Sequence, residues 1–414
     1  MSRPWMTQLF CNASRPALRL NDVIRAGTIG VILFLLCQGY VLFGQTSPKP
    51  RSFSSNFAGD AACKQCHSAI AGTYSHTAHH LTSQLPTKTT ISGSFSPGEN
   101  QLKTSNPDLH FRMEARANGF YQTAVFWQPP DEKTHSERFD FVTGSGEKGQ
   151  TYLYWKGDQL FQLPVSYWTE LHSWVNSPGF SDGSADFNRP IVPRCLECHA
   201  TYFASVPSEK AENFYKKTGF TLGVSCERCH GPGAEHVRSQ KLAANRTSGA
   251  DRQSIVNPSS LSRDRQMEVC AQCHGGIGES LAPAFSYVPG QPLENFIKLQ
   301  RPSEDARVDV HGNQVALTQR SRCYLSSQMT CTTCHDVHAP ERQPATYSEK
   351  CLQCHKDKDC GEFAKLGPKI RENCIDCHMP LQDSDLIISN VTGKQVKAHM
   401  RNHWIKVYPS TQAP

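Results

Sequence analysis

Apolar and polar residues alternate along two neighbouring segments in the second quarter of the chain. The runs "LHFRMEAR" and "FYQTAVFW" flank the short turn sequence "ANG". A period of two predicts strands with one buried face, and a turn between two such runs predicts a hairpin. The runs "ERFDFV", "QTYLYW" and "QLFQLPV" follow, separated by glycine-rich turns. We therefore expect a small antiparallel β insertion over residues 100–165.

The pattern changes after residue 195, where short segments are rich in Lys, Glu, Gln, Gly and Pro. The stretches "SEKAENFYKKTG" (208–219) and "GEFAKLGPKIREN" (361–373) predict short helices. No block rich in strands is expected in this part. The fold class predicted for the whole chain is mainly α, with extensive loops and one small antiparallel β insertion.

The N-terminal segment predicts export rather than a structural element. Four arginines precede the uncharged run "AGTIGVILFLLCQGYVLFG" (26–44), and a polar stretch follows it. A run of 19 residues is also long enough to remain as a membrane anchor, so both interpretations stay open, with cleavage near Gly44–Gln45 favoured. Cys37 could suggest a lipid-modified cysteine, but the preceding Leu36 is too bulky for that signal.

The chain has 414 residues, of which 38% are hydrophobic, and 18 are cysteines. The mean hydropathy of −0.51 is low for a chain of this size, so something other than aliphatic side chains is expected to fill part of the interior. Fourteen of the cysteines fall in seven Cys-x-x-Cys-His motifs. These motifs are "CKQCH" (63–67), "CLECH" (195–199), "CERCH" (226–230), "CAQCH" (270–274), "CTTCH" (331–335), "CLQCH" (351–355) and "CIDCH" (374–378).

This spacing is that of covalent haem attachment. Two thiols three positions apart form thioethers to the two vinyl groups of a haem, and the adjacent imidazole becomes the proximal iron ligand. A zinc ribbon has no use for a histidine at that position, and a disulfide framework would show varied spacings. Seven c-type haems are therefore predicted. The thioether residues are Cys63, Cys66, Cys195, Cys198, Cys226, Cys229, Cys270, Cys273, Cys331, Cys334, Cys351, Cys354, Cys374 and Cys377, and the proximal ligands are His67, His199, His230, His274, His335, His355 and His378.

Two cysteines of the chain after the export segment lie outside the motifs. Cys323 and Cys360 could form a disulfide in an exported protein, but neither flanking sequence shows that they meet, so two buried free thiols are favoured. The sequence "GSGEKG" (144–149) matches a dinucleotide-binding pattern, but a strand and a turn follow it where a helix is required. A hairpin turn is the better interpretation.

Eleven histidines remain after the seven proximal ones. His236 lies six residues after His230, and six extended residues span only about 20–22 Å, whereas a path around the haem edge is on the order of 25–30 Å. His236 therefore cannot bind the iron held by His230, and it binds another iron or none. The same argument applies more strongly to His338, three residues after His335.

The segments "ACKQCHSAIAGTYSHTAHH", "CERCHGPGAEH", "CTTCHDVHAP" and "CIDCHMP" resemble multihaem c-type cytochromes of the cytochrome c-552/4 type. That family is related to the broader group of hydroxylamine oxidoreductase and multihaem nitrite and tetrathionate reductases. The resemblance covers residues 58–90 and 190–405, and it is specific for haem attachment rather than for a reaction. It implies that His79, His236 and His403 are distal ligands to other haems, and His338 fits as a fourth.

Several alternatives to these distal ligands stay open. His76 and His80 are alternatives to His79 as a distal ligand, and His399 is an alternative to His403. His172 and His311 have no assigned role. His110 and His135 lie on the predicted β insertion and are expected at the surface. Met267, Met329 and Met400 could replace histidine at some iron, whereas Met379 directly follows a proximal ligand and cannot reach around its own haem.

The sequence predicts an exported heptahaem cytochrome that transfers electrons through closely spaced, mostly bis-histidine haems. The alternative is a multihaem oxidoreductase with one open haem, acting on a small nitrogen or sulfur compound. Whether the chain is an enzyme stays open, and no catalytic residue is assigned. The expected partners are redox proteins, membrane-associated or other cytochromes. The formal net charge of +6 does not indicate nucleic acid, because seven haems would add up to fourteen negative propionate charges.

The location expected is the periplasm or the outer face of the cytoplasmic membrane of a bacterium. The predicted organisation is an export signal or anchor (1–45), a first haem segment (46–99), the β insertion (100–165), a six-haem region (166–405) and a C-terminal tail (406–414).

Overall fold

The computed structural model describes residues 56–408, except 244–253, 277, 301–312 and 342. The chain divides into two compact units, 1–49 and 50–414, and everything below concerns the second unit. The predicted export segment, with Cys11 and Cys37, lies outside the described residues, and so does His311. Among the described residues, no helix combines the length and the apolar character needed to cross a membrane.

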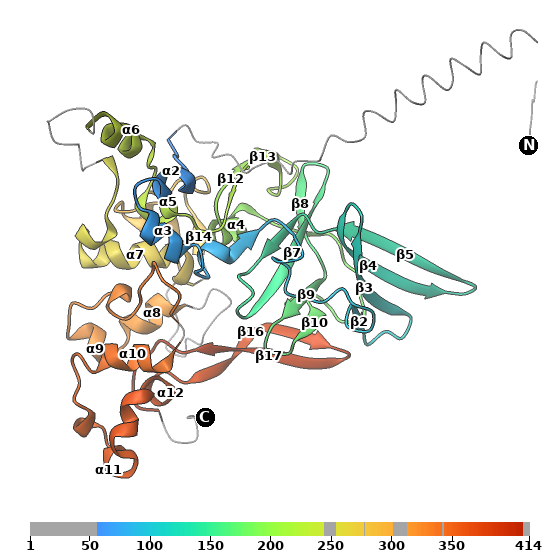
Figure 1. Cartoon of the computed structure of the whole chain (residues 1–414). Helices are drawn as coiled ribbons and strands as arrows, with labels where there is room; N and C mark the ends of the chain where they lie inside the picture. Colours follow the sequence, from blue (N-terminus) through green and yellow to red (C-terminus); the bar gives the residue numbers. More distant parts are fainter. Residues whose placement is uncertain (1–55, 244–253, 277, 301–312, 342, 409–414) are drawn as a thin grey trace, which may run out of the picture. The chain divides into compact units, whose positions relative to one another are not determined.

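A four-stranded antiparallel sheet forms the first part of the β region (Figure 1). Its strands, in spatial order, are β2 (Gln101–Lys103), β3 (Leu109–Arg116), β4 (Gly119–Gln128) and β5 (Asp131–Arg138). The register pairs Leu109 with Phe126 and Arg116 with Gly119, so the predicted hairpin around "ANG" is confirmed. The buried positions of β3 alternate along the strand, as its sequence pattern predicts.

A seven-stranded sheet follows, with the order β1-β6-β7-β8-β11, while β9 pairs with both β7 and β10. Its strands are β1 (Ser83–Gln84), β6 (Phe141–Thr143), β7 (Gly149–Lys156), β8 (Gln159–Gln162), β9 (Val165–Trp168), β10 (Ser173–Asn176) and β11 (Arg189–Pro190). The sequence "GSGEKG" joins β6 to β7, so its interpretation as a hairpin turn is confirmed. Gly144 and Gly146 have φ of 99° and 89°, values that residues with a side chain rarely adopt.

Aromatic side chains dominate the core between the strands. Phe111, Tyr152 and Trp174 are each at most 1% exposed, and all three belong to one apolar cluster. Gln122 of β4 ties the two sheets together: its amide accepts the Val165 N–H at 2.7 Å and donates to the Val165 carbonyl at 3.0 Å. The amide is fully buried and both of its polar atoms are satisfied, which avoids the cost of an unpaired polar group.

Three further antiparallel ladders lie after residue 199. They are β12 (Ala200–Ser205) with β13 (Tyr215–Leu222), β14 (Gly278–Ser280) with β15 (Ile297–Leu299), and β16 (Leu381–Val391) with β17 (Lys394–Arg401). The expectation of no strand-rich block in this part is therefore wrong. Buried Phe203 and Phe220 stack at 5.3 Å across the first ladder, which stabilises strands where "SEKAENFYKKTG" predicted a helix.

The α-helices are short. They are α2 (Asp60–Lys64), α3 (Ser68–Tyr74), α4 (Pro193–His199), α5 (Cys226–His230), α6 (Ala234–Ala243), α7 (Arg263–His274), α8 (Gln314–Gln319), α9 (Arg322–Leu325), α10 (Pro344–Cys351), α11 (Phe363–Leu366) and α12 (Ile375–His378). Single 3₁₀ turns lie at His80–Thr82, Pro258–Ser260, Leu293–Asn295, Cys331–Thr333, Asp357–Asp359 and Gly367–Glu372. The helical prediction for residues 361–373 is confirmed by α11 and the 3₁₀ turn that follows it.

The predicted fold class, mainly α, is wrong. The structure is 28% helical and 30% strand, with several antiparallel sheets. The physical reason is that most motif helices extend little beyond the motif itself, whereas the strands continue past residue 165 and return near the C-terminus. The long hairpin of β16 and β17 was missed because its polar residues mask the alternation that a strand normally shows.

Candidate functional site

One cavity of about 3610 Å³ is lined by members of all seven motifs. Cavities that hold one small molecule measure roughly 300–1,000 Å³, so this space suits several large groups. The seven motif histidines all line it: His67, His199, His230, His274, His335, His355 and His378.

The helical turn of each motif explains how one short segment aims three side chains at the same place. The His67 N–H donates to the Cys63 carbonyl at 2.9 Å, and the motif of His378 shows the same bond to Cys374 at 3.1 Å. In a helical turn, positions i, i+3 and i+4 share one face. Both cysteines and the histidine of a motif therefore face one group, as covalent haem attachment requires.

The segment 331–378 tests whether haems fit this space. It carries three motifs, yet Ile375 is its one buried hydrophobic side chain among the residues that the structure describes there. A folded segment of this length normally buries many more apolar side chains. A large apolar macrocycle on each motif would supply the missing core, so the residues present fit covalent haems.

Hydrogen bonds orient several of the imidazole rings. Nδ1 of His230 lies 2.9 Å from the Val256 carbonyl, and Nδ1 of His378 lies 3.0 Å from the Lys406 carbonyl. A carbonyl only accepts, so Nδ1 donates and Nε2 keeps the lone pair that binds a metal. His403 shows the same arrangement, with Nδ1 3.1 Å from the Arg401 carbonyl. His403 is thus oriented like a metal ligand although it lies outside the motifs.

Three motif histidines face a second histidine across the cavity. The ring centres of His274 and His79 are 5.9 Å apart, with an interplanar angle of 75°. The corresponding values are 6.0 Å and 17° for His230 with His338, and 6.3 Å and 24° for His335 with His403. Two imidazoles on opposite sides of one metal ion would have ring centres about 6 Å apart, because each metal–nitrogen bond is about 2 Å long.

Burial lowers the pKa of five of these imidazoles and so favours their neutral form. Desolvation lowers the pKa of His79 to about 4, and that of His403 also to about 4. Desolvation likewise lowers the pKa of His230, His274 and His335. The neutral ring is the form that binds a metal, so the site needs no proton release at neutral pH.

His236 lines the same cavity from the first turn of α6. Its Nδ1 is buried and has no hydrogen-bond partner. The helix starts against the segment that leads into the first motif, because the Ala234 N–H donates to the Asn56 carbonyl at 3.0 Å. The start of α6 is thereby held against the segment that precedes the first motif.

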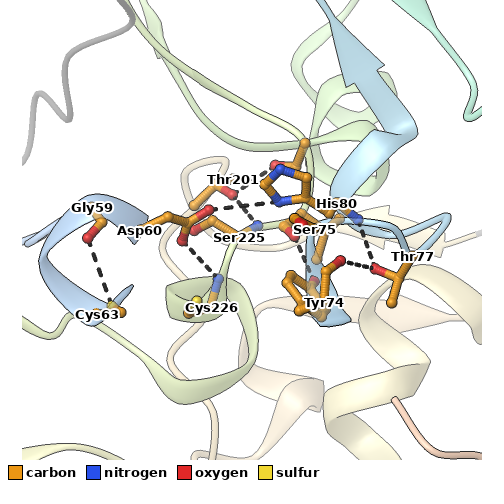
Figure 2. A network of polar contacts seen from close by, with 12 residues as sticks. Gly59, Asp60, Cys63, Tyr74, Ser75, Thr77, His80, Thr201, Ser225 and Cys226 are labelled. Carbon is orange, nitrogen blue, oxygen red and sulfur yellow. Dashed lines mark hydrogen bonds and ion pairs between the residues drawn. The ribbon is translucent and has the colours of Figure 1, made fainter. Parts of the chain in front are cut away.

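The other described histidines do not line the cavity; they are His76, His80, His110, His135, His172 and His399. His80 lies 3.7 Å from Asp60 in the polar network of Figure 2. His399 is 45% exposed and forms ion pairs with Glu170 and Asp383. Of the locally competing candidates, the structure thus brings His79 and His403 to the cavity and leaves His76, His80 and His399 outside it.

Thiol groups of different motifs meet inside the cavity. Cys63 of the first motif interacts with Cys226 of the third. Cys198 of the second motif interacts with Cys273 of the fourth, and Cys270 of the fourth interacts with Cys331 of the fifth. The cysteines of these paired motifs, where covalent groups would be attached, therefore lie side by side.

Cys323 and Cys360 also line the cavity, and both are half-buried free thiols. Cys323 acts electrostatically on Cys334 and Cys351, whereas Cys360 acts on Cys377. The two extra cysteines thus lie beside different motifs.

Buried charges inside the motifs are the feature that sequence analysis missed. Glu227 is 4% exposed and its carboxylate accepts the N–H groups of Ala58, Gly59 and Gly233 at 2.7–2.9 Å. Arg228, the next residue, is 5% exposed and donates to the Glu197 carbonyl at 3.0 Å. The only signal in the sequence is that charged residues occupy the two variable positions of "CERCH".

Comparison with known proteins gives one family model, "Cytochrome c554 and c-prime", which matches residues 173–231. "Multiheme cytochrome MtrA" of Shewanella baltica (strain OS185) is 26% identical over 209 residues, which are 46% of this chain and 47% of that protein. "C-type polyheme cytochrome OmcC" of Geobacter sulfurreducens (strain ATCC 51573 / DSM 12127 / PCA) is 25% identical over 179 residues, 37% of this chain and 21% of that protein. The chain thus matches less than half of the length of either relative.

A solved structure, "Crystal Structure of Outer Cell Wall Cytochrome OcwA", has a similar fold. Its TM-score is 0.51 at 18% sequence identity, and the match covers 85% of this chain and 80% of that one. The motifs, the cavity and these similarities together define the chain as a multihaem c-type cytochrome, which carries covalent haems with iron. The narrower assignment to the cytochrome c-552/4 type stays a prediction.

Proposed function

We propose that this chain is an exported heptahaem cytochrome that transfers electrons between redox proteins. The observation that carries the proposal is the single cavity that brings together all seven motif histidines and four more, His79, His236, His338 and His403. The chain's residues attach each haem through two thioethers and hold its iron on the proximal histidine. When bound, the haems supply one-electron redox chemistry.

The distances between imidazoles support particular ligand pairs. His79 pairs with His274, His338 with His230, and His403 with His335, since each pair has the separation of about 6 Å expected across one metal ion. His236 is assigned to the iron of the first motif, because the start of α6 contacts the segment before that motif. The short segment from His335 to His338 then supplies ligands to two irons.

The similar proteins support an extracytoplasmic role. Two are named as multihaem or polyhaem cytochromes, and the third is named as a cytochrome of the outer cell wall. Together with the predicted export segment, these names favour a location in the periplasm or on the outer side of a bacterial membrane. The partners proposed are other redox proteins, membrane-associated or cytochromes.

The number of histidines on the cavity favours a second function at one site. The described residues offer four histidines beyond the seven proximal ones, so the cavity has fewer distal histidines than motifs. In the pairing proposed above, the irons of His199, His355 and His378 have no assigned second histidine among the described residues. An iron held by one of them could stay open and bind a small nitrogen or sulfur compound, which makes a multihaem oxidoreductase the alternative.

Mass spectrometry and electron paramagnetic resonance of the oxidised, full-length protein test both functions. We expect the mass of seven haems and mainly low-spin irons. A high-spin signal that shifts with nitrite or hydroxylamine would support the oxidoreductase, whereas seven low-spin irons would exclude it. A mass with fewer than seven haems would contradict the heptahaem proposal itself.

A further inference from the structure

Two contacts between motifs carry opposite charge, and we propose that this charge separates the reduction potentials of the haems attached there. Carboxylates surround the contact between the first and third motifs, and guanidinium groups surround the contact between the second and fourth. The second and fourth sites are therefore the stronger electron acceptors. This inference rests on the proposed function, because it requires haems on these four motifs.

The acidic contact is formed by α2 and α5, whose cysteines Cys63 and Cys226 interact. Figure 2 shows Asp60 of α2 joined to Cys226 of α5. Asp60 accepts the Cys226 N–H at 3.2 Å. The Glu227 carboxylate accepts two N–H groups from the start of the same segment, those of Ala58 and Gly59. These two hydrogen bonds hold the carboxylate against the start of that segment. Among the described residues, no arginine or lysine forms an ion pair with either carboxylate, and His80 lies 3.7 Å from Asp60.

The basic contact is formed where Cys198 and Cys273 interact. Arg194 donates to the Gln272 carbonyl at 2.8 Å, and Arg228 donates to the Glu197 carbonyl at 3.0 Å, so both guanidinium groups reach these two motifs. Both also act electrostatically on Cys198 and Cys273.

The charges at the basic contact cancel only in part. The Glu197 carboxylate lies 3.4 Å from Arg194, which neutralises that arginine. Arg228 keeps its charge, because it bonds to a backbone carbonyl and its Nε is buried without a partner. One net positive charge is thus left beside the second and fourth motifs.

Helix geometry explains how one motif supplies both charges. Glu227 and Arg228 are adjacent in α5, and neighbouring residues of a helix point about 100° apart. Glu227 points to the first motif, and Arg228 points to the second and fourth. Buried charges act through a low effective dielectric constant, so they influence a nearby redox centre more than surface charges do. A positive charge stabilises the reduced iron and a negative charge stabilises the oxidised iron.

A spectroelectrochemical titration of the full-length holoprotein tests this charge separation. In Arg228→Met, we expect the high-potential part of the titration curve to move to lower potential. In Asp60→Asn, we expect the low-potential part to move to higher potential. The matched controls are Arg138→Met and Asp131→Asn on the exposed strand β5, which lies outside the cavity and should leave the curve unchanged.

Arg228→Lys separates charge from packing, because it keeps the charge in a different shape. The curve of this variant should lie close to that of the wild type. Equal shifts in Arg228→Lys and Arg228→Met would overturn the proposal, and so would unchanged curves in Arg228→Met and Asp60→Asn at full haem content. Mass spectrometry of the wild-type protein counts the attached haems and so tests the proposed function separately. Missing haems would contradict the proposed function, whereas unchanged potentials at full haem content would contradict only the charge effect.

Discussion

The β region (residues 101–190) and the segment 331–378 are held together in different ways. In the β region, aromatic side chains such as Phe111, Tyr152 and Trp174 are almost completely buried against one another. In the segment 331–378, Ile375 is the one buried hydrophobic side chain among the described residues. The β region thus carries its own core, whereas the motif segment, in the proposed function, depends on the haems that it would attach.

Preparing the chain without haem should produce the largest difference between the two regions. We expect the β region to keep slow hydrogen exchange, because its core consists of its own side chains. Segment 331–378 should exchange rapidly, since the free energy of cofactor binding is part of its folding free energy. Hydrogen–deuterium exchange with mass spectrometry measures both regions in one sample. Equal protection of both regions would show that the motif segment folds on its own.

Trp174→Ala tests the other half of the comparison. Removing a buried aromatic side chain should lower the free energy of unfolding of the β region by about 3–5 kcal/mol. Haem content and the haem absorption spectrum should stay unchanged. Denaturant unfolding followed by hydrogen exchange measures the effect, with Trp127→Ala, which is 52% exposed, as the control. A loss of haem in Trp174→Ala would show that the two regions fold together.

Gln122→Leu should have a smaller effect on the same region. The buried amide makes two hydrogen bonds to Val165, and their loss leaves the backbone N–H and carbonyl unpaired. We expect a cost of about 1–3 kcal/mol in the free energy of unfolding. Gln128→Leu at the exposed end of β4 is the matched control and should change stability by less than about 0.5 kcal/mol. A neutral Gln122→Leu variant would mean that this tie between the sheets is dispensable.

His338→Ala should leave stability almost unchanged and alter one iron. In the proposed pairing, the iron held by His230 loses its second ligand and becomes high-spin, while the iron held by His335 stays low-spin. His236→Ala should likewise change an iron other than that of His230. Electron paramagnetic resonance counts the high-spin irons, and His399→Ala, which removes an ion-paired surface histidine, is the control. A low-spin spectrum in His338→Ala would contradict the pairing.

The same contrast explains what the sequence could predict. The hairpin of β3 and β4 follows from alternation, because each strand has one buried and one exposed face. The motifs follow from spacing, because attachment needs both cysteines and the histidine on one helical turn. The ladder of β12 and β13 was missed, since its stability comes from contacts between Phe203 and Phe220 that lie far apart in the sequence.

The choice among neighbouring histidines shows the same limit. His76, His79 and His80 are equivalent by spacing, yet His79 alone of the three lines the cavity in the described structure. The pairing of His79 with His274 depends on the path of the chain between them, which no local pattern encodes. The total of eleven non-motif histidines does not give the number of distal ligands, because six of the described ones lie outside the cavity.

The positions of the paired histidines set an order of assembly. A chain that is synthesised and exported from its N-terminus presents His79 before His274, so that pair can close as soon as the later motif arrives. His335 must wait for His403, and His230 must wait for His338. In the proposed pairing, the iron sites on His230 and His335 are therefore completed from downstream, and the one on His335 stays incomplete until His403 has been delivered.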